Sequence, residues 1–215
     1  MMRYSTLLLL MLASVGCNRF EPDKAAGTPA AKPVTQPRAK QPVVSPPVVA
    51  AARNQVGKTV LYDPAYVGLK YPGGDVPIER GVCTDVVIRS LRGAFRMDLQ
   101  KLLHEDMQKA FSQYPTIWGL KRPDKNIDHR RVPNLRTYFK RRGYSVGVSQ
   151  NPEDYLPGDI VTCKVGGNRP HIMIVSDKKT AAGVPLVIHN IGRGAKEESR
   201  LFSFPITGHY QIKAE

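Results

Sequence analysis

The fold of this chain is decided by one stretch, which reads Gly81-Val82-Cys83-Thr84-Asp85-Val86-Val87-Ile88-Arg89-Ser90-Leu91. Apolar residues recur at four-residue spacing at Val87, Leu91 and Phe95, and this period predicts a helix over residues 84–95. Cys83 therefore stands at the start of a helix. Because the positive end of a helix lowers the pKa of a thiol, this position favours a nucleophilic cysteine.

Two apolar strands that carry histidines follow much later in the chain. They read Pro170-His171-Ile172-Met173-Ile174-Val175-Ser176-Asp177 and Val187-Ile188-His189-Asn190. An imidazole can take a proton from a thiol and later return it to a leaving group. A cysteine at a helix start followed by a histidine and a second polar residue on neighbouring strands predicts a cysteine hydrolase. His189 and Asn190 compete for the third position, since adjacent strand residues face opposite sides.

The remaining pattern places helices first and strands later. We expect helices over residues 54–65, 84–95, 98–114 and 134–142, and strands over residues 159–165, 171–176, 186–189 and 208–212. Cys163, on the first of these strands, is expected to be a buried structural thiol. Helices that precede an antiparallel sheet indicate an α+β domain, with N-terminal helices packed on a small sheet.

The N-terminus has the features of an export signal. Arg3 supplies positive charge, residues 7–12 form an apolar run, and small residues precede Cys17. This resembles the lipobox of bacterial lipoproteins, which implies a signal peptide over residues 1–16 and a lipid on Cys17. A plain signal peptide cut nearby remains an alternative. By the same resemblance, Asn18 after the cysteine favours an outer-membrane lipoprotein on the periplasmic side of the cell envelope.

Residues 17–52 are expected to be a disordered tether, because prolines recur among alanine, valine and polar residues without any helical or strand period. Residues 53–215 then form one catalytic domain. The chain has a formal net charge of +14, which favours polyanionic partners. No nucleic-acid motif accompanies the charge, so we expect no nucleic acid as a partner and favour polymers of the cell envelope.

Three short motifs resemble the papain-like hydrolases of the NlpC/P60 superfamily. They are Pro157-Gly158-Asp159 before a strand, His171-Ile172-Met173-Ile174 on the next, and Ile188-His189-Asn190 on the one after. The resemblance implies that Cys83 is the nucleophile, that His171 is the general base and that His189 orients His171. The chain departs from the usual pattern around the cysteine, where Val82 replaces an aspartate and Thr84 a serine.

A resemblance to the bacterial DUF1287 family, which has a papain-like assignment, covers nearly the whole domain. The matching stretches are Tyr62-Asp63-Pro64, Tyr71-Pro72-Gly73-Gly74-Asp75-Val76-Pro77, Gly81-Val82-Cys83-Thr84-Asp85, His104-Glu105-Asp106-Met107, Asn126-Ile127-Asp128-His129-Arg130-Arg131-Val132-Pro133-Asn134-Leu135 and Ile188-His189-Asn190-Ile191-Gly192. This family implies no substrate.

Several polar residues are candidates for substrate binding. In one interpretation, the guanidinium of Arg130 or Arg131 forms a bidentate pair with a substrate carboxylate. In the other, Asp128 caps a turn and pairs with an arginine. The backbone N–H of Cys83 is expected to stabilise an oxyanion, with a second donor from Tyr62, Tyr66 or Tyr71. The full set of expected substrate contacts is Asp85, Asp128, His129, Arg130, Arg131, Tyr66 and Asn190.

Other catalytic classes have weaker support. His104-Glu105-Asp106 with Asp128 and His129 suggests a metal site, but helical residues one and two apart diverge, and no H-x-x-x-H pair occurs. No G-x-S-x-G motif of a serine hydrolase is present. We therefore expect neither metal nor cofactor.

The function expected from these features is a cell-envelope hydrolase that cleaves an amide bond in peptidoglycan, as an endopeptidase or amidase, through a thioester on Cys83. Its partners would be peptidoglycan stem peptides and, through the lipid, a membrane. A non-catalytic wall-binding lipoprotein of the same fold and an acyltransferase or thioesterase acting on lipids remain the alternatives.

Overall fold

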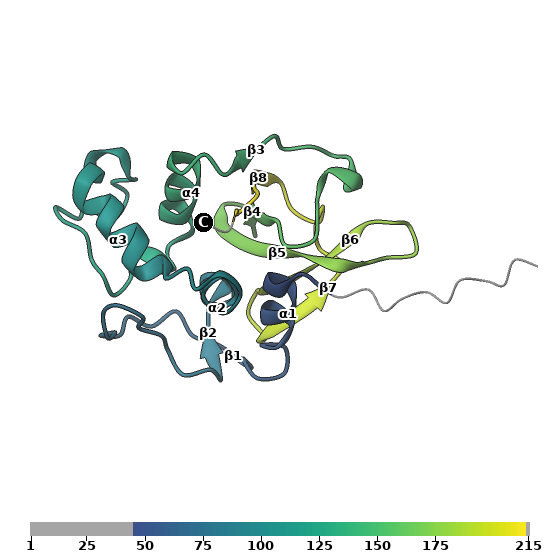
Figure 1. Cartoon of the computed structure of the whole chain (residues 1–215), viewed down its shortest axis with the longest axis horizontal. Helices are drawn as coiled ribbons and strands as arrows, with labels where there is room; N and C mark the ends of the chain where they lie inside the picture. The colour runs from purple at the N-terminus through teal and green to yellow at the C-terminus, as the bar shows by residue number, and fades with distance from the viewer. Residues whose placement is uncertain (1–44, 214–215) are drawn as a thin grey trace, which may run out of the picture. The chain divides into compact units, whose positions relative to one another are not determined.

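A computed structural model describes residues 45–213 of the chain. The expected signal peptide, the lipid on Cys17 and most of the expected tether lie outside these residues. The helices are α1 (Pro47–Arg53), α2 (Cys83–Phe95), α3 (Leu99–Ala110) and α4 (Val132–Arg141), with short 3-10 turns η1 (Phe111–Gln113), η2 (Asp128–Arg130) and η3 (Pro152–Asp154). All four helices precede one antiparallel sheet (Figure 1).

The sheet has six strands in the order β3 (Ser145–Val146), β8 (Ile206–Tyr210), β4 (Ile160–Val165), β5 (Arg169–Lys179), β6 (Pro185–Asn190) and β7 (Ala195–Glu198). Two further short strands, β1 (Leu61–Tyr62) and β2 (Arg80–Gly81), pair in parallel just before α2. The expected α+β class is confirmed. The strands expected over residues 159–165, 171–176, 186–189 and 208–212 correspond to β4, β5, β6 and β8.

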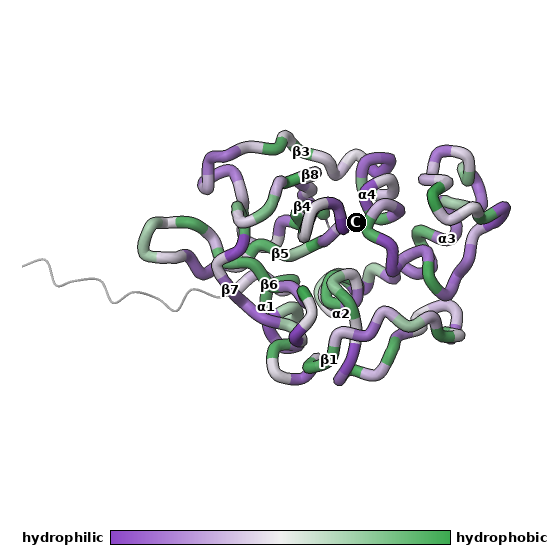
Figure 2. The backbone as a smooth tube through the Cα atoms, turned by 180° about the vertical axis from the view of Figure 1, so that it is seen from behind, coloured by the Kyte–Doolittle hydropathy of each residue, from purple (hydrophilic) through white to green (hydrophobic). Residues whose placement is uncertain are grey.

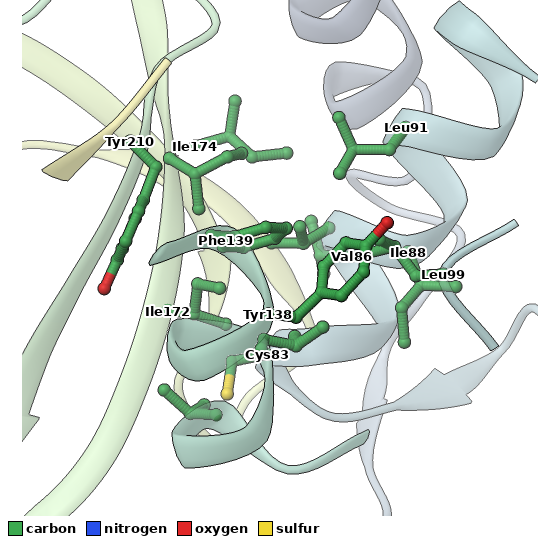
Figure 3. Packing of buried hydrophobic residues seen from close by; sticks show 14 of the residues in the cluster. Cys83, Val86, Ile88, Leu91, Leu99, Tyr138, Phe139, Ile172, Ile174 and Tyr210 are labelled. Atoms are coloured by element: carbon green, nitrogen blue, oxygen red, sulfur yellow. The ribbon is translucent and has the colours of Figure 1, made fainter. Parts of the chain in front are cut away.

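Both faces of the sheet are covered. The larger hydrophobic core joins the four helices to one face, and it includes Cys83, Ile172, Ile174 and Ile188. Figure 2 shows that α2 is largely hydrophobic, and Figure 3 shows its side chains among those of α4 and β5. A second cluster covers the other face, with Tyr155, Val161, Cys163, Met173, Val175, Val187 and Leu201. Cys163 is thus buried and free, as expected.

The folded region begins earlier than expected. The boundary at residue 53 is wrong, because residues 47–53 form α1 and bury Val48, Val49 and Ala52 against the core. The helix expected over residues 54–65 is also wrong, since this segment is a turn followed by β1. Pro47 lies in the first turn of α1, where a proline without an N–H is tolerated, so the proline-rich composition hid a helix start.

We expect Val49→Asp to destabilise the full chain by about 3 kcal/mol or more, because burial of a valine contributes about 1.5–3 kcal/mol and a buried carboxylate costs more. The neighbouring Ala50→Asp is the matched control, since Ala50 is exposed on the same helix. Urea unfolding followed by circular dichroism measures both. Equal midpoints for the two variants would show that α1 is not part of the folded core.

Within residues 45–213, no helix is both long and apolar enough to cross a membrane.

Candidate active site

Cys83 begins α2 and forms part of the wall of a cleft of about 320 Å³. Its side chain is 4% exposed. The other lining residues are mainly apolar or aromatic, namely Tyr62, Pro64, Val82, Ile117, Trp118, Ile127, Val132, Pro133 and Pro170, together with Arg130 and Arg131. The predicted cysteine at a helix start is therefore found, beside a cleft that can hold a small organic group.

A buried ion pair fixes the start of α2. The carboxylate of Asp85 accepts a hydrogen bond from the backbone N–H of Val82 at 2.6 Å, and also two from Arg130 at 2.9 Å each. The side chains of Arg130 and Asp85 are 2% and 4% exposed. Gly81 has φ +156°, and a Cβ there would lie 3.0 Å from Asp85, so a larger residue would disturb this corner.

The same guanidinium holds the loop that follows β1. Arg130 donates from Nη1 to the carbonyl of Ala65 at 3.0 Å and from Nη2 to that of Asp63 at 3.1 Å. Four of its five N–H donors thus bond to the protein. Asp85 and Arg130 were expected to contact substrate. The structure joins them in a buried ion pair at the start of α2, and Arg130 also lines the Cys83 cleft.

The two strand histidines contact each other. Nε2 of His171 lies 2.8 Å from Nδ1 of His189, and Nε2 of His189 lies 3.0 Å from Oε1 of Glu198 on β7. His171 and His189 are both buried. Of the two candidates for the third position, His189 is therefore the one that contacts His171. Glu198 was missed from the sequence, because the polar segment Ala195–Glu198 has no apolar alternation that would predict a strand.

Asn190 contacts the backbone segment that precedes Cys83. Its Nδ2 donates to the carbonyl of Gly81 at 2.9 Å, and its Oδ1 accepts from the N–H of Gly192 at 3.1 Å. These bonds join the end of β6 to the segment that precedes Cys83. Asn190 therefore positions backbone, and no contact supports its expected role in binding substrate.

The Cys83 thiol lies next to the backbone of β5, the strand that carries His171. The N–H of Ile172, the residue after His171, favours the thiolate of Cys83. No hydrogen bond joins the thiol to the imidazole among the described side chains. Ile172 packs with Cys83, and alternation along β5 directs His171 to the opposite face of the strand. His171 lines a neighbouring cleft of about 220 Å³, and Tyr62 and Pro170 line both clefts.

Burial keeps both candidate reacting groups, the Cys83 thiol and the His171 imidazole, neutral. Burial raises the pKa of the Cys83 thiol to about 12, which outweighs the nearby backbone N–H groups of Ile172 and Thr84. Burial, with a smaller effect of the charge on His189, lowers the pKa of His171 to about 3. The pKa of His189 is lowered by burial as well, although Glu198 opposes the shift. At neutral pH the site therefore holds a thiol and an uncharged imidazole.

This protonation state predicts slow alkylation of Cys83 at neutral pH. Because iodoacetamide reacts with the thiolate, the rate should rise about tenfold for each pH unit between pH 7 and 10, below the raised pKa. Peptide mapping by mass spectrometry measures the alkylation of Cys83 separately from that of Cys17 and Cys163. A rate that is already constant from pH 5 to 8 would instead reveal a thiolate–imidazolium pair.

Tyr62 is the tyrosine that lies beside the nucleophile. Its pKa is raised by burial and by the neighbouring charge of Cys83. The hydroxyl of Tyr66 instead contacts Asp124 and Asn126, and the ring of Tyr71 packs edge to face on His104. Of the three candidates for the second oxyanion donor, Tyr62 is the one placed to serve. Tyr66 joins two loops and does not line the Cys83 cleft.

The segment containing Asp128 mixes structural and cleft residues. Asp128 is buried and accepts hydrogen bonds from the N–H of Asp124 and, at 3.0 Å, from Arg131. The expected pairing of Asp128 with an arginine is therefore found, but its side chain bonds the preceding segment at Asp124 and caps neither η2 nor α4. His129 is buried, lines neither cleft, and has a pKa lowered to about 4 by burial. Arg131 lines the Cys83 cleft, with its guanidinium 4.1 Å from the ring centroid of Trp118.

Within residues 45–213, no three histidine, cysteine, aspartate or glutamate side chains gather in a geometry that could hold a metal ion. Of the residues weighed for a metal site, Asp106 pairs with Arg141 at 2.7 Å and Asp128 with Arg131.

Comparison with known proteins identifies a family and a relative. Residues 49–212 match the family described as "Domain of unknown function (DUF1287)". The chain is also 55% identical over 183 residues to the "Uncharacterized protein YijF" of Escherichia coli (strain K12), with 80% of this chain and 89% of the relative covered. The matched family region begins inside α1, which agrees with a domain that includes this helix.

Proposed function

The chain belongs to the DUF1287 family, and we propose that it is a papain-like cysteine hydrolase that cleaves an amide bond in peptidoglycan. One observation carries the proposal. Cys83 lies at the start of a helix, in the wall of a cleft, next to the backbone of a strand whose histidine pairs with a second histidine. A wall-binding module has no need of this combination.

The proposed reaction has two halves. Sγ of Cys83 attacks the carbonyl carbon while His171 takes the thiol proton, and the resulting oxyanion receives hydrogen bonds from the N–H of Cys83 and the hydroxyl of Tyr62. His171 then protonates the leaving nitrogen, which leaves a thioester. In the second half His171 takes a proton from water, the hydroxide attacks the thioester, and the carboxylic acid departs as the thiol is restored.

Substrate binding must complete this site. The thiol and the imidazole are both neutral, share no hydrogen bond and lie on opposite faces of β5, so the proposed reaction requires a rearrangement that brings the His171 ring to the Cys83 thiol. Catalytic hydrogen bonds are often long in an empty site and tighten when substrate binds. Tyr62, which lines both clefts, is the side chain best placed to respond to a ligand that occupies them together.

The charge of the two clefts supports an anionic substrate. Arg131 lines the Cys83 cleft and Arg169 the His171 cleft, and no aspartate or glutamate is among the described residues that line either one. The backbone of Arg169 pairs with Val165 of β4, and its guanidinium makes no ion pair or hydrogen bond within residues 45–213. Peptidoglycan stem peptides carry carboxylates close to their amide bonds, so arginines on both sides of the nucleophile fit this class. Arg131, rather than Arg130, is the proposed carboxylate contact in the earlier segment.

The proposed setting is the periplasmic side of the cell envelope. Cys17 would carry the lipid and anchor the protein to the outer membrane, and residues 18–44 would connect it to the domain. The net charge of +14 supports a partner among the anionic polymers of the envelope.

The apolar cleft lining favours a second candidate. Ile117, Trp118, Ile127 and Val132 beside Cys83 can contact a hydrocarbon chain as well as a peptide side chain. A thioesterase or acyltransferase that acts on lipids would use the same nucleophile and the same thioester.

Mass spectrometry of purified muropeptides, incubated with the chain from residue 18 onward, tests the proposal. We expect new fragments whose masses identify the cleaved amide bond. Acyl thioesters of graded chain length are assayed in parallel. Release of acyl chains without new muropeptide fragments would replace the proposed function with the second candidate.

A further inference from the structure

The carboxylate of Glu198 extends the histidine pair by one member. Glu198 lies on β7, whose register pairs it with Val187, two residues before His189 on β6. Its Oε1 is 3.0 Å from Nε2 of His189, and Nδ1 of His189 is 2.8 Å from Nε2 of His171. Three side chains from three neighbouring strands thus form one row of hydrogen bonds, on β5, β6 and β7.

We infer that Glu198 is a positioning residue that selects the ring nitrogen of His171 available as a base. An ionised carboxylate only accepts hydrogen bonds, so Nε2 of His189 must carry the proton in this contact. Nδ1 of neutral His189 is then an acceptor, and Nε2 of His171 must donate to it. Nδ1 of His171 therefore keeps its lone pair.

The remaining contacts support this assignment of protons to the ring nitrogens. Glu198 has a half-buried side chain, 32% exposed, and the nearest cation is Arg200, whose Nε lies 3.8 Å from the same oxygen. Burial lowers the pKa of His189, and the charge of Arg200 lowers it further. His171 faces His189, and no carboxylate contacts it directly. Burial lowers the pKa values of both imidazoles, so both are neutral at pH 7.

The arrangement has a catalytic consequence that rests on the proposed function. When His171 takes the thiol proton at Nδ1, its ring becomes cationic, and the Nε2–H bond to His189 strengthens. The carboxylate of Glu198 stabilises that charge through the intervening ring. Without an acceptor at Glu198, His189 can reverse its tautomer, and the Nδ1 of His171 would then carry the proton and could not act as a base.

Nitrogen-15 NMR of the histidine-labelled chain tests the inference without a substrate. The shifts of ring nitrogens distinguish protonated from unprotonated atoms, and His171→Gln and His189→Gln assign the signals. At pH 7 we expect Nε2–H and bare Nδ1 for both His171 and His189. In Glu198→Gln, whose amide can accept or donate, we expect a mixture of tautomers, with kcat lowered about 10- to 100-fold and KM nearly unchanged.

Glu197→Gln is the matched control. Glu197 is on the same strand but pairs with Arg53 and Ser176, so this change should lower stability and leave both tautomers intact. A wild-type His171 protonated at Nδ1 would overturn the inference, as would Glu198→Gln with unchanged tautomers. Failure of muropeptide cleavage with the expected tautomers would reject only the proposed function, since the NMR result does not depend on a substrate.

Discussion

Cys83→Ala is expected to abolish the fragments that the wild-type chain makes from muropeptides. Removal of the nucleophile that forms the covalent intermediate lowers kcat by about 10⁴-fold or more in hydrolases of this kind. The substitution removes one sulfur atom from the larger core, next to the backbone of Ile172 (Figure 3). The fold should survive, and circular dichroism checks this.

Cys163→Ala is the matched control for the nucleophile. Cys163 is also buried but belongs to the cluster on the other face of the sheet, where its backbone pairs with that of His171 on β5. Its own side chain lines neither cleft. We expect this variant to lose a little stability and keep full activity. Equal fragments from the wild type and Cys83→Ala would remove the proposed mechanism, whatever the result for Cys163.

The second large effect is expected from Asp85→Ala, which should destabilise the chain by about 3–5 kcal/mol. The change leaves the Arg130 guanidinium buried without its partner, and it also removes the acceptor for the N–H of Val82. Such a loss is a large part of the whole stability of a domain of this size. Urea unfolding of the full chain measures it directly.

Two control variants are measured beside Asp85→Ala. Glu153→Gln removes an exposed ion pair with Lys179 and should leave the urea midpoint unchanged, because such pairs contribute little. The double variant Asp85→Leu with Arg130→Met should recover part of the loss, since no charge is left buried alone. A cost below about 1 kcal/mol for Asp85→Ala would mean that water reaches this pair and that it does not fix the start of α2.

The elements with a strong period could be predicted from the sequence. The four-residue spacing of Val87, Leu91 and Phe95 gave α2, and the apolar runs around Ile174 and Ile188 gave β5 and β6. These segments bury one side or both, so their hydrophobicity reports their structure directly. The candidate nucleophile and the histidine pair were found because they stand at the ends of such segments.

The other elements depend on tertiary contacts that composition does not reveal. α1 lies in a proline-rich segment and is held by burial of Val48 and Val49. β7 is a polar edge strand held by pairing with β6, and so Glu198 was missed. Arg130 and Arg131 are adjacent in sequence and both line the cleft, yet Arg130 is fixed on Asp85 whereas Arg131 pairs with Asp128 and packs on Trp118. Nothing in the order of residues distinguishes the two.

A cysteine that is held protonated also resists oxidants. The thiolate is the form that attacks peroxide and disulfides, and a pKa raised to about 12 leaves very little Cys83 in that form at pH 7. An enzyme exposed to an oxidising compartment could then keep its nucleophile reduced for long periods without a dedicated reductase. Reactivity would arise only while a substrate occupies the clefts, so the burial that slows the free thiol also extends the working lifetime of the protein.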